Sequence, residues 1–156
     1  MLKKAFTLIE LIFVIVIIGI LSAYAIPKFS GLSDNSKISA ELSTAASVQV
    51  AIGACHGEWI INEGSFICGV DIDGSTDLTD QGYPKDDKLG ESDTKALNKI
   101  LKNAENSGWI RSSTTQYRGP ASNDTDGISN CKVGKPCNTK YWDYNSTTGT
   151  FTLTSE

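Results

Sequence analysis

Histidine is almost absent from this sequence of 156 residues, in which His56 is the only one. A single histidine leaves little room for a His-rich metal centre or for a catalytic triad. A basic surface is lacking as well, because the 14 Lys and Arg residues are outnumbered by 18 Asp and Glu, giving a net charge of −4. Proteins that neutralise nucleic-acid phosphates carry the opposite charge. The composition therefore argues against these enzyme classes and against nucleic acid as a partner.

Charged residues are also nearly missing from residues 6–26, where Glu10 is the only one. As an α-helix this segment would span about 31 Å, which matches the hydrocarbon core of a bilayer. Lys3 and Lys4 precede it, so the positive-inside rule places Met1 in the cytoplasm and the acidic remainder outside. We therefore expect one membrane-spanning helix in front of an acidic, water-exposed head.

Two ordinary explanations compete for the apolar segment. As a secretory signal peptide it has a charged start and a small-x-small site at residues 23–25, and cleavage after Ala25 would release a soluble binding protein. Pro27 just beyond that site, and Glu10 inside a long apolar run, argue against this explanation. A plain membrane anchor gives no reason for a carboxylate whose burial in lipid is costly unless it is paired.

The order of residues at the N-terminus supports a third explanation. The chain reads Lys3-Lys4-Ala5-Phe6-Thr7-Leu8-Ile9-Glu10-Leu11, followed by Gly19-Ile20-Leu21 and Ala25-Ile26-Pro27-Lys28. This order resembles the N-terminus of type IV prepilins and of type II secretion pseudopilins. In that family a prepilin peptidase cuts before the Phe and methylates the new amine. The resemblance implies cleavage between Ala5 and Phe6 and N-methylation of Phe6, although Ala5 stands where the family usually has Gly.

The resemblance further implies a structural subunit with no catalytic activity and no cofactor. Such subunits sit in the bacterial inner membrane, with a cytoplasmic N-terminus and a periplasmic head, until an assembly platform and its ATPase add them to a filament of like subunits. The filament is either a type IV pilus or the pseudopilus that drives protein export in type II secretion. Three regions are implied: a leader at 1–5, a transmembrane and polymerisation helix at 6–27, and a head at 28–156.

Glu10 has a physical role that can be argued without the family. Cleavage before Phe6 creates a cationic amine at the head of a helix that lies in lipid. When subunits stack with an axial offset, Glu10 of one chain can meet the Phe6 amine of its neighbour. A low dielectric strengthens this pair and raises the cost of every unpaired state, so the pair selects one register. We interpret Glu10 as an assembly determinant; the alternative is a polar residue tolerated near the interface.

Gly19 and Pro27 predict weak points in the long helix. Proline removes a backbone donor and clashes with the carbonyl four residues back, and glycine lowers helix propensity by about 1 kcal/mol. We expect a kink or local melting between them, although both residue types are common in membrane helices.

The head is predicted to be an α+β, pilin-like fold, in which the amphipathic half of the long helix packs on a small antiparallel sheet. The helix should end near Gly53 and Gly57, with Lys37, Glu41 and Gln49 off its buried stripe. That stripe is predicted to comprise Phe29, Leu32, Ile38, Leu42, Ala45, Val48, Ile52 and Cys55. A second helix is expected over 93–106, strands at 109–110 and 116–118, and a hairpin of 141–144 with 150–153.

The four cysteines lie beyond the apolar segment, where an oxidising compartment favours two disulfides. Of the three connectivities we favour Cys55–Cys68 with Cys131–Cys137, because both loops are short. A zinc site of four thiolates is the competing interpretation, and the absence of a close Cys-x-x-Cys pair weakens it.

Two acidic turns in the head are candidates for a structural calcium ion, which some pseudopilins bind in head loops. The residues are Asp71, Asp73, Asp77 and Asp80 in the first turn, and Asp124 and Asp126 in the second. Neither turn has the spacing of an EF-hand. Solvated turn residues are the alternative.

Overall fold

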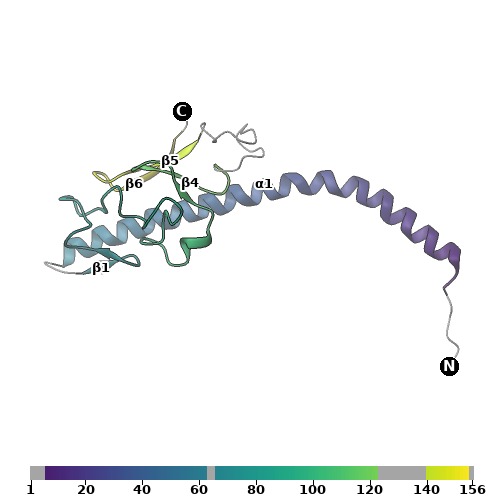
Figure 1. Ribbon diagram of the computed structural model, residues 1–156, viewed down its shortest axis with the longest axis horizontal. Helices are drawn as coiled ribbons and strands as arrows, with labels where there is room; N and C mark the ends of the chain where they lie inside the picture. Colours follow the sequence, from purple (N-terminus) through teal and green to yellow (C-terminus); the bar gives the residue numbers. More distant parts are fainter. Residues whose placement is uncertain (1–5, 63–65, 123–139, 155–156) are drawn as a thin grey trace, which may run out of the picture. The chain divides into compact units, whose positions relative to one another are not determined.

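The computed structural model describes residues 6–62, 66–122 and 140–154 (Figure 1). The chain divides into two compact units, Met1–Ser36 and Lys37–Glu156, and each is described by itself. The elements in chain order are α1 (Leu8–Ile61), β1 (Ile67–Cys68), β2 (Ile72–Asp73), the 3-10 helix η1 (Ala104–Asn106), β3 (Ile110–Arg111), β4 (Gln116–Arg118), β5 (Tyr141–Asn145) and β6 (Thr150–Thr154). One long helix and short antiparallel strands make the predicted α+β, pilin-like fold.

The first unit contains the apolar start of α1. The stretch Leu8–Phe29 is long and apolar enough to cross a membrane, and none of it is buried. A second stretch, Asn35–Ile61, passes the same test of length and composition, but 28% of it is buried in the protein. Its apolar character is explained by packing within the head. Gly19 and Pro27 both lie inside α1, and the kink that they suggest stays a prediction.

The main sheet has four antiparallel strands in the order β3-β4-β5-β6, while β1 and β2 form a separate pair. The predicted hairpin is confirmed, with Tyr144 opposite Phe151 in β5 and β6. Its turn is closed by Asn145, whose side-chain oxygen accepts from the amides of Thr147 and Thr148. Gly149 completes the turn with a φ of 65°, a conformation that favours glycine.

The core of the head forms where α1 meets the sheet. The confirmed part of the predicted helix stripe is Ala45, Val48, Ile52 and Cys55, at the alternating spacing of three and four residues that defines one helix face. Aromatic rings cover it from the sheet: Trp142 stacks on Phe151 at 5.4 Å between centroids, and Tyr117 meets Phe151 edge-on at 5.6 Å. Ile38 is partly buried. The prediction was wrong for Phe29, Leu32 and Leu42, which are all at least half exposed.

Glu41 occupies the place in the core that was predicted for its neighbour Leu42. Its side chain is only 5% exposed. One oxygen, Oε2, accepts from the amides of Ala121 and Ser122 at 2.7 and 2.8 Å, and Oε1 accepts from the indole N–H of Trp142 at 2.7 Å. Three donors from the sheet side thus converge on one carboxylate from α1. This network ties the helix to β5 and to the turn after β4.

Gln49 was also expected to lie off the packed face, and it instead binds the edge of the sheet. Its side-chain amide donates to the carbonyl of Gly149 and accepts from the amide of Phe151, both at 2.8 Å. A side-chain amide here takes the role that a neighbouring strand would play. The pairing closes part of the edge of β6, which a sheet otherwise leaves open to other chains.

The long helix continues past its predicted end at Gly53 and Gly57 and stops at Ile61. A Cβ atom at either glycine would meet nothing within 4 Å, so nothing in the packing around them requires glycine. In the added turn, Trp59 stacks on His56 with centroids 5.7 Å apart, and His56 stacks on Tyr83 at 4.3 Å. The modest penalty of glycine in a helix is outweighed by such tertiary contacts.

The predicted second helix over 93–106 was wrong, although its apolar side chains are buried. The segment forms turns and the short η1. The amides of Lys99 and Ile100 donate to the carbonyl of Leu89, and the carbonyl of Lys99 accepts from the amide of Val70 at 2.7 Å. These bonds use groups that an α-helix needs internally, and Asn103 has a φ of 68°, outside the helical region.

One predicted disulfide is confirmed. Cys55 and Cys68 are bonded, with Cα atoms 5.1 Å apart, and this bond joins α1 to β1. Cys131 and Cys137 lie outside the described residues, so their pairing stays a prediction.

We expect Glu41→Gln to destabilise the head by about 2–4 kcal/mol, because a glutamine would turn an N–H₂ group towards buried N–H donors and leave at least one of them unsatisfied. Thermal or denaturant unfolding of the full chain in detergent measures the effect. The matched control is Glu105→Gln, at an exposed carboxylate paired with Lys95, where a change below about 0.5 kcal/mol is expected. Equal effects of the two substitutions would contradict the role given to Glu41.

Candidate functional site

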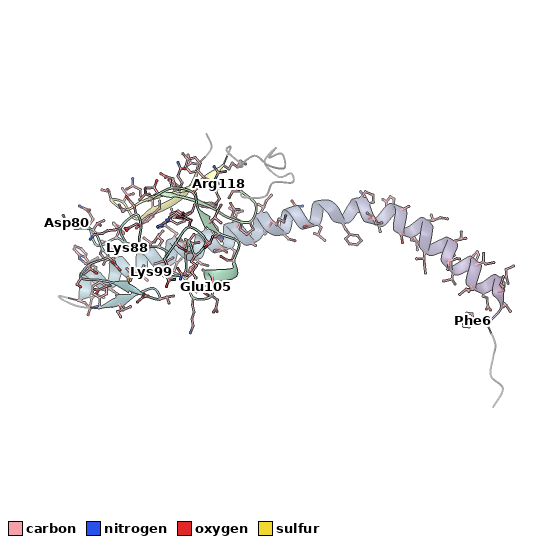
Figure 2. The ribbon with its side chains drawn as sticks, viewed as in Figure 1. Phe6, Asp80, Lys88, Lys99, Glu105 and Arg118 are labelled. Carbon is pink, nitrogen blue, oxygen red and sulfur yellow. A yellow bond between two sulfur atoms is a disulfide. The ribbon has the colours of Figure 1, made fainter. Side chains whose placement is uncertain are left out.

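The candidate site lies at the start of α1, where the sequence predicts cleavage, methylation and assembly. Phe6 and Thr7 precede the helix, which begins at Leu8, and Figure 2 shows Phe6 at this end. Glu10 lies in the first helical turn. Phe6 is 83% exposed. Ala5, on the other side of the predicted scissile bond, lies outside the described residues.

Thr7 and Glu10 bind each other in a reciprocal arrangement. The carboxylate Oε2 of Glu10 accepts from the backbone amide of Thr7 at 3.1 Å and from its hydroxyl at 2.9 Å. In return, the amide of Glu10 donates to the hydroxyl oxygen of Thr7 at 3.4 Å. A Thr before the helix bonded in this way to a Glu three residues later is a capping box, which satisfies amides that the first helical turn leaves unpaired.

The two carboxylate oxygens of Glu10 differ in their surroundings. Both bonds from Thr7 reach Oε2. Within residues 6–62, 66–122 and 140–154, Oε1 accepts no hydrogen bond, and the side chain is exposed. An ionised carboxylate can accept at both oxygens. Thr7 therefore holds one oxygen in place, while none of the residues that the structure describes donates to the other.

The surroundings of this carboxylate explain why an outside donor would matter. Residues on either side are exposed and apolar, among them Leu8, Ile9 and Leu11, each at least 60% exposed. In lipid, a carboxylate with one open oxygen is stabilised by a cation far more than it would be in water. A site of this kind can bind an ammonium group.

Sequence reasoning identified Glu10 but missed Thr7. It considered only a cation from a neighbouring chain as a partner of the carboxylate, whereas the structure also shows hydrogen bonds from Thr7 of the same chain. The signal was present, because Thr-x-x-Glu in front of an apolar run is the sequence pattern of a capping box.

Three of the four candidate calcium residues in the first acidic turn, Asp71, Asp73 and Asp77, have partners in the protein. Asp73 accepts from the amide and hydroxyl of Ser75 at 2.8 and 2.6 Å, and these bonds hold the pKa of Asp73 below its ordinary value. Asp71 lies 3.9 Å from the ammonium of Lys99. Lys88 and Lys99, both labelled in Figure 2, belong to the segment between β2 and β3.

Asp77 is the most buried of these acidic residues. Burial opposes its ionisation, but Lys88, at 3.0 Å, and the backbone amide of Asp73 act together against that effect, and the pKa of Asp77 lies below its ordinary value. In the part of the chain that the structure describes, no three His, Cys, Asp or Glu side chains form a group that could hold a metal ion. Asp124 and Asp126 lie outside that part.

The N-terminal segment matches a known family model. Residues 1–26 match the model described as the prokaryotic N-terminal methylation motif. Ala5, Phe6, Thr7 and Glu10 all fall within this match.

Similar proteins are pilus components. A type IV major fimbrial protein FimA of Dichelobacter nodosus is 44% identical over 54 residues, which are 35% of each chain. Another FimA of that species is 35% identical over 95 residues, covering 56% of this chain and 59% of the relative. The type IV narrow pilus major component PilA5 of Thermus thermophilus is 54% identical over 48 residues, covering 31% and 41%. The chain thus spans from about a third to three fifths of the length of these relatives. No solved structure matches it.

We expect Thr7→Ala to loosen the first turn of α1, because it removes the hydroxyl from the capping box. Loss of a helix cap costs about 1 kcal/mol, which corresponds to roughly fivefold faster amide exchange at residues 8–11. Hydrogen exchange of the full chain in micelles measures this. Thr7→Ser keeps the hydroxyl and should exchange at the original rate; if serine and alanine behave alike, the capping box does not hold the turn.

Proposed function

We propose that this chain, a relative of the type IV pilins, is a structural subunit of a type IV pilus. The methylation motif at residues 1–26 carries the proposal. The similar proteins are fimbrial or pilus components, which favours a pilus over the pseudopilus of type II secretion. The relationship to structural proteins likewise favours a subunit over an enzyme.

Maturation would begin at the inner membrane, where Leu8–Phe29 provides a helix of spanning length. Prepilin peptidase would cut between Ala5 and Phe6 and methylate the new amine. Because α1 begins at Leu8, the mature chain would start two residues before the helix. Its positive charge would then lie at the same end of the helix as Glu10.

Assembly would use the open oxygen of Glu10. The amine of Phe6 from a neighbouring subunit would approach Oε1, while Thr7 keeps Oε2 in place through the bonds at 2.9 and 3.1 Å. Holding the carboxylate in one orientation reduces the conformational entropy lost when the pair forms. Apolar surroundings would make a subunit in the wrong register costly, because its carboxylate would lack a cation. The inner-membrane platform and its ATPase would supply the work of extracting the helix from lipid.

The central test is Glu10→Val in the native host. Cleavage and membrane insertion should persist, whereas filament yield should fall by more than about tenfold, because a lost pair in lipid is worth more than the ~1.4 kcal/mol that corresponds to that factor. Immunoblots of the membrane and of sheared filaments measure both quantities. Ile9→Val, next to it in sequence, is the control and should assemble normally. Filaments from Glu10→Val at the original yield would contradict the pairing.

The cleavage site is tested through the mature N-terminus and residue 5. Mass spectrometry should find N-methyl-Phe6 as the first residue, whereas an N-terminus at Ile26 would support a secreted protein instead. Ala5→Gly should be processed at least as fast as the original chain, and Ala5→Leu should block processing by crowding the peptidase cleft. Equal processing of all three chains would indicate a different enzyme.

A further inference from the structure

The head has an apolar hollow where α1 meets the last two strands. It has a volume of about 90 Å³, and its lining includes Ile38 and Leu42 from α1 and Trp142 and Leu153 from the sheet. Leu42 and Leu153 are 50% and 45% exposed, so their side chains remain open to a partner. An apolar hollow of this size suits one branched aliphatic side chain better than water, which needs several polar partners.

A single cation, Lys140, lies in the lining of this hollow. Lys140 is exposed and forms no ion pair with any residue that the structure describes. The carboxylate of Glu41, which also lines the hollow, is engaged by its three hydrogen bonds. A complementary surface therefore has an aliphatic side chain next to a negative charge.

The C-terminal end of the same helix presents such a surface. Ile61, the last residue of α1, is 79% exposed, and Ile60 is 64% exposed. Glu58 lies three residues before Ile61, on the same side of the helix. Its carboxylate accepts from the side chain of Asn62 at 2.7 Å and forms no ion pair among the described residues. The pattern of an isoleucine beside a carboxylate matches the hollow in shape and in charge.

We propose that Ile61 of one subunit inserts into the hollow of the next subunit, with Glu58 paired to Lys140. The occupant is a second copy of this chain, so this inference rests on the proposed function. Ile61 lies 19 residues after Leu42, about 28 Å along the helix. Because the two surfaces differ and lie at different places along one helix, the contact is heterologous. Contacts of this type do not close on themselves and extend into open filaments.

Cross-linking of filaments carrying Leu42→Cys and Ile61→Cys tests the contact. The two positions are too far apart in one chain for a short bismaleimide, so bonds can form only between subunits. A ladder of dimers, trimers and longer products is expected from the double variant, and no product from either single variant. The control pairs Ile61→Cys with Thr114→Cys, in an exposed turn, and should give no ladder.

A photo-reactive benzoylphenylalanine at position 42 gives a second measurement that adds no thiol near Cys55–Cys68. Its cross-linked peptide should contain residues 58–62 of another subunit. Cross-links within one monomer would mean that the chain covers its own hollow, and these would overturn the proposal. A product limited to dimers in a single-cysteine variant would indicate a two-fold contact and would overturn it too.

Charge reversal tests the pairing. Lys140→Glu and Glu58→Lys should each lower filament yield about threefold or more, and the double reversal should restore it. Lys102→Glu, at an exposed lysine that does not line the hollow, should have no effect. If the unaltered chain forms filaments but shows neither the ladder nor the restoration, this contact is wrong and the pilus function stands. If the chain forms no filaments, the proposed function fails, and cross-linking at high concentration in detergent tests the contact separately.

Discussion

The head depends on one carboxylate buried among neutral donors. Glu41 brings an acceptor-only group from α1 to a place where two backbone amides and an indole N–H would otherwise lack partners. Burial of a charge is normally costly, and three good hydrogen bonds offset that cost. They also specify one arrangement, because Gly119 lies so close to Glu41 that a Cβ there would meet its Cγ at 2.5 Å. Helix, turn and strand are thus fixed against one another by a single side chain.

Glu10 also accepts hydrogen bonds from its own chain, but among the described residues it does so at one of its two carboxylate oxygens. Both glutamates on α1 accept from groups of their own chain, but Glu41 uses both oxygens whereas Glu10 uses only Oε2. A fully satisfied carboxylate stabilises a fold, and a half-satisfied one in apolar surroundings favours association with a cation. The difference in bonding explains why one glutamate acts within the subunit and the other is suited to act between subunits.

Residues whose local pattern matches their structural role could be predicted from sequence. The hairpin, the Cys55–Cys68 bond and the apolar start of α1 each follow from a short pattern. The failures share a cause, which is that tertiary partners override local preference. Glu41 was expected in solvent because its donors come from residues about eighty positions later, and residues 93–106 are not helical because Leu89 and Val70 take their backbone groups. No pattern within one segment contains that information.

The two proposed contacts between subunits require different displacements. Pairing the Phe6 amine of one chain with Glu10 of another shifts the two by about four residues of helix, or about 6 Å, whereas placing Ile61 beside Leu42 requires about 28 Å. Two copies related by one axial displacement cannot form both contacts. In the proposed filament each subunit would therefore meet one neighbour through the charge in its apolar segment and another through its head. A single stack of subunits excludes this arrangement, and a helical array with several neighbours per subunit permits it. The charge pair would set the register, because a slip would leave a carboxylate without a cation, and the heads would add apolar burial in water, where the charge pair would contribute little.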